Sequence, residues 1–112
     1  MPQSEDAIQS DFFQSVWNKF PQTRHLLFAV PNGGRRTVTE AAKFKATGVV
    51  AGIPDMCFCW DGKIYGIEVK TETGVLSPNQ KKVHAAWEAQ NIEVFVIRSA
   101  KEGLKIIESI IK

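Results

Sequence analysis

Three ionisable side chains interrupt two short apolar segments in the middle of the chain, where folding alone does not require them. Asp55 precedes the segment Met56–Trp60, while Glu68 and Lys70 lie at the end of the segment that starts at Ile64. Buried charges are costly unless they are paired or bound to a metal ion. Two acids and a lysine in this arrangement therefore indicate a functional site that can bind a cation.

The two apolar segments are predicted to form a β-hairpin, and its register brings Asp55 and Glu68 together. Asp61-Gly62 between them favours the positive φ angles of a two-residue turn. Trp60 then faces Lys63 and, counting outwards, Asp55 faces Glu68, with Cβ atoms roughly 4.5–5.5 Å apart. Two carboxylates at this distance repel, so one stays protonated unless a cation lies between them.

The alternation of side chains along a strand places Lys70 on the same face as Glu68, roughly 6.6 Å further along. The other residues of this predicted site face are mostly small: Asp55, Cys57, Cys59, Ile64 and Gly66. The opposite face is apolar and is predicted to lie in the core: Met56, Phe58, Trp60, Tyr65, Ile67 and Val69. One face is therefore interpreted as the site and the other as its support.

The composition fits one small globular domain over residues 1–112, with 44% hydrophobic and 23% charged residues. No apolar segment approaches the length of a membrane span, and the N-terminus lacks the regions of a signal peptide, so a cytoplasmic setting is expected. Cys57 and Cys59 are two apart in one predicted strand, which suits neither a disulfide nor a zinc site. They are interpreted as buried thiols.

Charge is unevenly distributed along the chain although its net charge is only +2. Residues 1–18 carry three acidic side chains and no lysine or arginine, whereas residues 19–45 carry six basic side chains and one acidic. This asymmetry indicates a polyanionic partner. The alternative is an ordinary solvated surface, and charge alone does not decide between the two.

Capping residues and apolar periodicity predict the remaining elements. Helices are expected over 5–20, over 41–47 after a cap at Thr37, from Pro78 to about 90, and after Ser99, with strands over 25–30 and 92–98. A helix between two strands favours a parallel crossover. The fold class is therefore α/β, with a mixed sheet covered by helices in the order α-β-α-β-β-α-β-α.

With these elements in place, the motifs resemble a known family. Pro54-Asp55 followed by Glu68-Val69-Lys70 resembles the PD-(D/E)xK nuclease signature. The segments Gly52–Asp55, Glu68–Thr71 and Gly74–Gln80 narrow the resemblance to the VRR-NUC branch, most firmly over residues 48–99. The resemblance implies a restriction-endonuclease-like mixed sheet flanked by helices. Stand-alone members of this size resemble phage and bacterial Holliday-junction resolvases, and other members are domains of repair nucleases.

The family resemblance also implies roles for individual residues. Asp55, Glu68 and the backbone carbonyl of Val69 would hold Mg²⁺ or Mn²⁺, which prefer hard oxygen ligands. Lys70 would orient or deprotonate the attacking water, or stabilise developing negative charge. Gln80 matches the family's glutamine and would position Lys70 or the water, although helix capping explains it equally well. Glu5 matches an acidic metal-ligand position near the N-terminus; its alternative is a surface acid at a helix start.

The expected function is a metal-dependent, structure-specific DNA endonuclease that cuts branched DNA such as Holliday junctions, in a bacterial cell or a phage-infected host. A four-way junction requires two symmetric cuts, so a homodimer is expected. The alternatives are the same chemistry on flaps, nicks or linear ends, and a non-catalytic nucleic-acid-binding module. Candidate contacts to the DNA backbone, each of which has simple surface exposure as its alternative, are Arg35, Arg36, Lys43, Lys45, Lys81 and Lys82.

Overall fold

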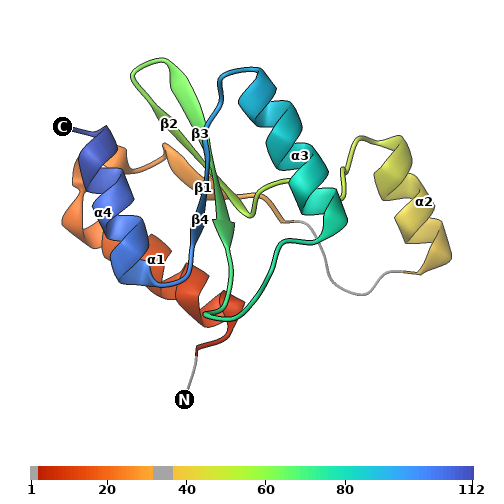
Figure 1. Ribbon diagram of the computed structural model, residues 1–112, viewed down its shortest axis with the longest axis horizontal. Coiled ribbons are helices and arrows are strands. Elements are labelled where there is room, and N and C mark those ends of the chain that lie inside the picture. The colour runs from red at the N-terminus through yellow and green to blue at the C-terminus, as the bar shows by residue number, and fades with distance from the viewer. Residues whose placement is uncertain (1–2, 32–36) are drawn as a thin grey trace.

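The computed structural model describes residues 3–31 and 37–112. Its elements follow the predicted order α-β-α-β-β-α-β-α, which confirms the α/β class (Figure 1). A short 3₁₀ turn at Pro21–Thr23 follows the first helix. The helices are α1 (Glu5–Lys19), α2 (Val38–Ala46), α3 (Pro78–Ala89) and α4 (Ala100–Ile110), and the strands are β1 (Leu27–Ala29), β2 (Met56–Trp60), β3 (Lys63–Val69) and β4 (Val94–Ile97).

The four strands form one mixed sheet in the order β1-β2-β3-β4. β1 pairs with β2 and β2 with β3 in antiparallel fashion, while β3 and β4 are parallel. α3 makes the crossover between the two parallel strands, as predicted from a helix that separates two strands. The sheet therefore leaves β1 and β4 as its edges, with the hairpin strands in the middle (Figure 1).

The central hairpin has the predicted turn and register. Asp61 and Gly62 have φ angles of 51° and 75°, both in the left-handed region that a tight two-residue turn requires. Trp60 pairs with Lys63, and the ladder continues to Met56 and Ile67. The register that places Asp55 beside Glu68 is thus confirmed up to the last pair before those two residues.

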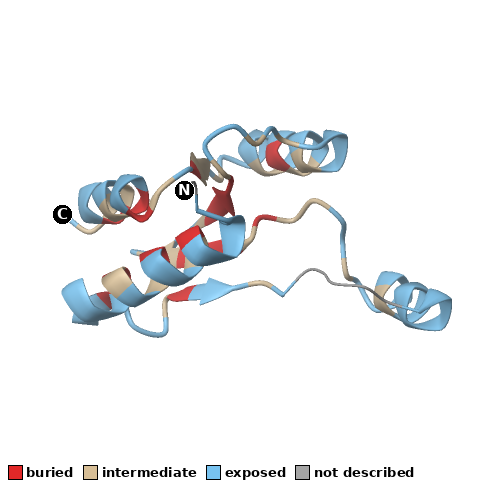
Figure 2. Ribbon diagram, turned by 90° about the horizontal axis from the view of Figure 1, so that it is seen from below, coloured by how far each residue is buried: buried red, intermediate tan, exposed pale blue. Residues whose placement is uncertain are grey.

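The hydrophobic core lies on the face of the sheet predicted for it, beneath α1 and α4. Phe58 and Ile67 of the hairpin are buried against Phe12 of α1 and Ile107 of α4. The buried residues of α1 form a stripe along the side that faces the sheet (Figure 2). α4 approaches α1 closely at Gly103, where an added Cβ atom would lie 2.5 Å from the ring of Phe12.

The opposite face of the sheet is covered by α3. Gly66 permits this contact, because an added Cβ atom would lie 2.9 Å from Cγ of Pro54 and 3.1 Å from Cζ3 of Trp87. Cys57 on the same face is buried, and Cys59 is half-buried. The small residues predicted on the site face therefore make room for a helix, and the polar residues beyond them lie beneath it.

α2 stands apart from the rest of the molecule (Figures 1 and 2). None of its residues is buried, and Val38 at its start is 88% exposed. Its N-terminus is capped as predicted, since the Thr37 hydroxyl accepts the backbone N–H of Glu40 at 3.0 Å. A nine-residue helix gains little stability from its own hydrogen bonds alone.

Two strands are shorter than the sequence predicts. The strand expected over 25–30 begins only at Leu27, because His25 has a φ angle of 72° that does not fit an extended chain. The strand expected over 92–98 covers Val94–Ile97. Its start is later than predicted because Asn91 has a φ angle of 63°, and because the backbone N–H of Ile92 donates to the carbonyl of Trp87 and so belongs to the turn after α3.

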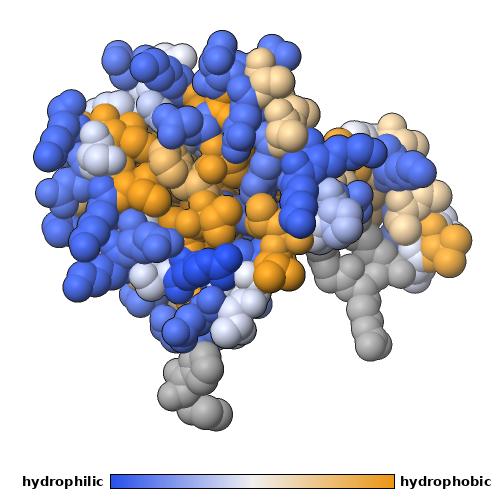
Figure 3. All heavy atoms as spheres, in the orientation of Figure 1, coloured by the Kyte–Doolittle hydropathy of each residue, from blue (hydrophilic) through white to orange (hydrophobic). Residues whose placement is uncertain are grey.

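The surface in the orientation of Figure 1 has hydrophobic side chains near its centre and hydrophilic side chains around them (Figure 3). Within residues 3–31 and 37–112, no helix is long and apolar enough to cross a membrane.

Candidate active site

The two acids meet where the hairpin ladder ends. Oδ2 of Asp55 accepts the backbone N–H of Val69 at 2.7 Å, which ties the residue before β2 to the end of β3. The backbone carbonyl of Asp55 accepts the N–H of Val30 at 2.8 Å, so the neighbouring strand holds it as well. The Asp55 carboxyl group also makes a hydrogen bond with that of Glu68. The structure therefore brings together the two acids that the register predicted to be neighbours.

Glu68 is completely buried, with a relative exposure of 0%. Burial, followed by the hydrogen bond with Asp55 and the negative charge of Asp55, raises the pKa of Glu68 to about 9. The positive charge of Lys70 acts in the opposite direction, and the charge of Glu5 adds slightly to the increase. Without a cation, the Glu68 carboxyl group is thus held in its protonated form at neutral pH.

Two side chains of α3 bind the two oxygens of Glu68. Nε2 of His84 lies 2.8 Å from Oε1, and Nε2 of Gln80 donates to Oε2 at 3.3 Å. Gln80 also forms the predicted capping box with Ser77: its Oε1 accepts the Ser77 N–H at 2.8 Å, and its own N–H is bound by the Ser77 hydroxyl at 3.1 Å. The same amide group therefore caps the helix and contacts the acidic pair.

His84 is the site residue that the sequence did not indicate. Together with Lys81 and Lys82 it gives the first half of α3 a basic composition, which does not by itself indicate a buried position. The side chain is buried, and burial lowers its pKa, so the imidazole is neutral at pH 7. Its contact with Glu68 is then a hydrogen bond and not an ion pair. The available signal was its spacing of four from Gln80, which places both residues on one side of a helix.

Lys70 follows directly after β3 and is 92% buried. Its backbone N–H donates to the carbonyl of Ile97 at 3.0 Å, which extends the parallel pairing by one residue. The turn after it is held by Arg98, whose Nη1 donates to the carbonyl oxygens of Thr71 and Gly74 at 2.7 Å each. Among the described residues, Lys70 makes no ion pair within 4.0 Å, although its positive charge acts on Glu68.

The remaining predicted residues lie at varying distances from this centre. Glu5 is exposed in the first turn of α1, and its charge reaches Glu68 weakly. Four predicted DNA contacts are exposed, on α2 or in the first half of α3: Lys43, Lys45, Lys81 and Lys82. Arg35 and Arg36 lie outside the described residues.

A cleft of about 750 Å³ lies between α2 and the start of α3, and its lining includes neither Asp55 nor Glu68. Lys45 lines it from the α2 side and Gln80 from the α3 side. Gly52 forms part of its floor with a φ angle of 90°, and an added Cβ atom there would lie 2.5 Å from the carbonyl oxygen of Asn79. The cleft is thus lined both by an exposed lysine of α2 and by the glutamine that contacts Glu68.

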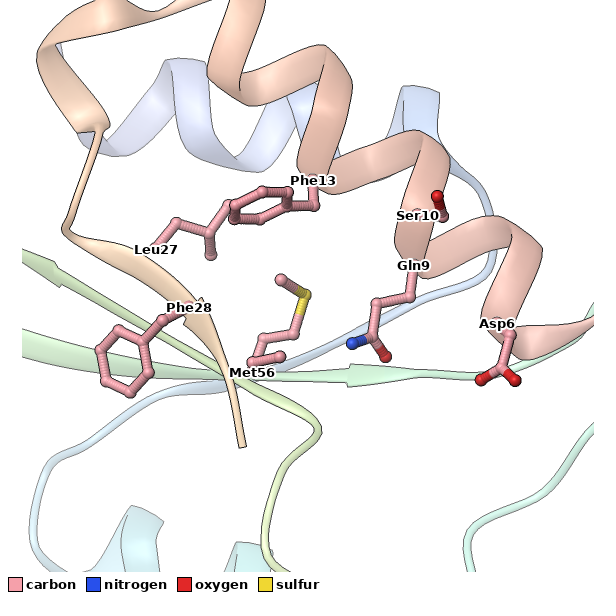
Figure 4. A pocket seen from close by; sticks show the side chains of 8 residues that line it. Asp6, Gln9, Ser10, Phe13, Leu27, Phe28 and Met56 are labelled. Carbon is pink, nitrogen blue, oxygen red and sulfur yellow. The ribbon is translucent and has the colours of Figure 1, made fainter. Parts of the chain in front are cut away.

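A second hollow of about 410 Å³ lies between α1 and β1 (Figure 4). It is mainly apolar, and Phe13, Leu27 and Met56 point into it from α1, β1 and β2. None of its lining residues belongs to the predicted site, so the cleft beside α3 is the better candidate for the substrate.

The acidic pair fits a divalent metal of the oxygen-binding kind. Within the described part of the chain, no three His, Cys, Asp or Glu side chains form a group that could hold a metal ion alone. Two carboxylates supplemented by a backbone carbonyl and water suit Mg²⁺ or Mn²⁺, which keep several water ligands. Burial first, and then the hydrogen bond and negative charge of Asp55, disfavour the ionised form of Glu68, and a bound cation would favour that form.

A mixed sheet whose central hairpin ends in two neighbouring acids, with a lysine directly after it, has the arrangement that the PD-(D/E)xK signature predicts. The chain belongs to the VRR-NUC family, because the model of the VRR-NUC domain matches residues 3–101. This is a nuclease domain, for which DNA is the implied partner and a divalent metal the implied cofactor.

Comparison with solved structures gives the same fold. The chain is similar to a VRR-NUC domain protein with a TM-score of 0.79 and 21% identity, covering 98% of this chain and 89% of the other. It is also similar to a VRR-NUC domain with a TM-score of 0.61 and 23% identity, covering 95% and 97%. A comparison with curated proteins gives no match.

Proposed function

We propose that the protein is a metal-dependent DNA endonuclease that hydrolyses phosphodiester bonds in branched DNA. The observation that carries the proposal is the contact between the carboxyl groups of Asp55 and Glu68, with Lys70 two residues further along the chain and its charge acting on Glu68. The acids are held in contact despite their repulsion, and the nearby lysine has no ion-pair partner among the described residues. Folding stability alone does not favour this arrangement.

The proposed metal ligands are Asp55, Glu68 and the backbone carbonyl of Val69, with Glu5 at the periphery. The hydrogen bond from the Val69 N–H fixes the Asp55 carboxylate, and α3 fixes that of Glu68. A bound Mg²⁺ or Mn²⁺ ion would polarise the phosphoryl oxygen and lower the pKa of a bound water. The chain's contribution is to hold its oxygen ligands in place before the substrate arrives.

Lys70 is the proposed catalytic group of the protein itself. Its ammonium group would orient the attacking water or stabilise the negative charge that develops on the phosphate. Burial of the side chain and the Arg98-bound turn after it restrict its motion. Gln80 is proposed to act through Glu68, which its amide group contacts at 3.3 Å. The role implied by the family resemblance, positioning Lys70 or the water, stays a prediction.

The proposed DNA path runs along the cleft between α2 and α3. Lys45 lines this cleft, and Lys43, Lys81 and Lys82 are exposed on the two helices that border it. Lysine side chains bind phosphates without sequence preference, which suits an enzyme that recognises DNA by its structure. Gln80 lines the cleft and contacts Glu68, so a strand that occupies the cleft would bring a phosphate towards the acidic pair.

A homodimer is proposed because two symmetric cuts are needed to resolve a four-way junction and one chain provides one site. The surface that supports this proposal is the edge of the sheet at β1. Phe28 is 44% exposed there, beside the apolar hollow between α1 and β1 (Figure 4). Exposed strand edges with apolar side chains are suited to self-association.

A panel of labelled DNA structures tests the proposal. The wild-type protein should cleave four-way junctions with Mg²⁺ or Mn²⁺ faster than flaps, nicked duplexes or linear ends, and should be a dimer by light scattering. Faster cleavage of another DNA structure would reject four-way junctions as the preferred substrate but would still support metal-dependent phosphodiester hydrolysis. A protein that binds DNA but cleaves nothing and binds no metal would instead be a non-catalytic module.

Matched substitutions test the roles of the residues. Asp55→Asn and Lys70→Met keep side-chain size but remove the charge, and each should reduce cleavage at least about 100-fold while DNA binding persists. Lys105→Met, an exposed lysine on α4, should leave cleavage unchanged. Cleavage by either site variant at the wild-type rate would reject the assigned role.

A further inference from the structure

We propose that His84 is a positioning residue of the metal site, which donates a hydrogen bond from Nε2 to Glu68 and so fixes the orientation of its carboxylate. The inference rests on the proposed function, because it assigns Glu68 to a metal site. His84 itself would touch neither the metal nor the DNA. It would act through the carboxylate that it contacts.

The contact is short and shielded from solvent. Nε2 of His84 lies 2.8 Å from Oε1 of Glu68, and the relative exposures of the two residues are 6% and 0%. Gln80, one helical turn earlier, occupies the other oxygen at 3.3 Å. A single helix therefore holds both oxygens of one carboxylate, which fixes its plane as well as its distance from Asp55.

The direction of this hydrogen bond follows from the chemistry of a metal ligand. A carboxylate that binds a metal ion is ionised and can only accept hydrogen bonds. Nε2 of His84 must then carry the proton, and Nδ1 must be the unprotonated nitrogen of a neutral imidazole. A neutral ring is also the form that a buried site favours. Hydrogen bonds of this kind to metal ligands typically account for 10- to 100-fold in metal affinity.

A purely structural role would not require this residue type. An apolar side chain of similar size could fill the space between α3 and the sheet, but it would leave Oε1 of Glu68 without its donor. A glutamine can place an amide N–H close to the position of Nε2. These two replacements therefore separate packing from hydrogen bonding.

Calorimetric titration with Mn²⁺ in the absence of DNA tests the proposal on the wild type, His84→Met and His84→Gln. His25→Asn, which removes the chain's other and exposed histidine, is the matched control. We expect affinity to fall 10- to 100-fold in His84→Met, to recover to within about fivefold of wild type in His84→Gln, and to be unchanged in the control. Wild-type affinity in His84→Met, or equal loss in both His84 variants, would overturn the inference.

Nitrogen-15 spectra of the wild-type imidazole rings give a second measurement that needs no folded variant. With Mn²⁺ replaced by diamagnetic Mg²⁺, His84 should be the neutral ring with its proton on Nε2. A proton on Nδ1 would overturn the inference. Failure of the proposed function is recognised separately, because the wild type would then bind neither metal and cleave no DNA; failure of the positioning role alone leaves wild-type binding and cleavage intact.

Discussion

The metal-free protein should lose stability as the pH rises from about 6.5 to 8.5, and Glu68 is the cause. Its pKa is raised to about 9 in the folded protein, against an ordinary value of 4.5. Throughout this range the folded state therefore holds a proton on Glu68 that the unfolded state has lost. Stability falls with rising pH wherever the folded state binds more protons.

The size of the effect follows from the same linkage. One extra bound proton lowers the unfolding free energy by at most about 1.4 kcal/mol per pH unit, so two units give an upper limit of roughly 2.7 kcal/mol. For a chain of this length that corresponds to roughly 10 °C in Tm. His84 acts in the opposite direction, since its lowered pKa favours folding as the pH rises, but only below about its ordinary value of 6.5. His84 at the lower end of the range and Cys57, whose pKa burial raises, at its upper end also contribute, so the comparison with a variant that lacks Glu68 is needed.

Thermal unfolding of the wild type and of Glu68→Gln, in a chelator and at several pH values, is the appropriate assay. Glutamine keeps the shape of the side chain but does not titrate, so its Tm should change much less over this range. Saturating Mg²⁺ should flatten the wild-type curve, because it stabilises the ionised carboxylate. Parallel curves for the two proteins, or a wild-type Tm that rises with pH, would refute the assignment of a strongly raised pKa to Glu68.

Three further substitutions probe the supports of the site. Gly103→Ala should destabilise the protein by about 1–2 kcal/mol in a denaturant titration, because the added methyl group meets the buried ring of Phe12 and only partly regains this through helix propensity. Gly52→Ala should reduce both stability and cleavage, since the new Cβ atom meets the Asn79 backbone at a φ angle of 90°; a fully active variant would contradict this. Arg98→Met should increase amide hydrogen exchange of residues 71–74 and slow cleavage, because the turn after Lys70 loses its hydrogen-bond donor. Unchanged exchange would show that the turn is stable without Arg98.

The hairpin and its acidic pair could be predicted from the sequence because their determinants are local. The Asp61-Gly62 turn fixes the register, and the register fixes which residue lies beside Glu68. The start of α3 was also predictable, since the Ser77 cap, the proline after it and the Gln80 amide all act within one turn.

The relation of α3 to the sheet could not be predicted in the same way. His84 contacts a residue sixteen positions earlier in the chain. Its spacing of four from Gln80 places both residues on one side of α3, but it does not show which side faces the sheet. The position of α2 away from the sheet could not be predicted either, because its cap and periodicity resemble those of any short surface helix. Both features depend on packing between distant segments, which single-sequence patterns do not encode.

Gly66 gives the molecule an unexpected point of vulnerability. Trp87 and Pro54 occupy the space where a side chain at position 66 would lie, so even an added methyl group would clash with them and displace α3 from the sheet. Raising the helix by a fraction of an ångström would stretch both of its bonds to Glu68 while the core on the other side of the sheet stayed intact. A variant at this position would therefore fold but lose cleavage activity, although glycine itself has no functional group in the site.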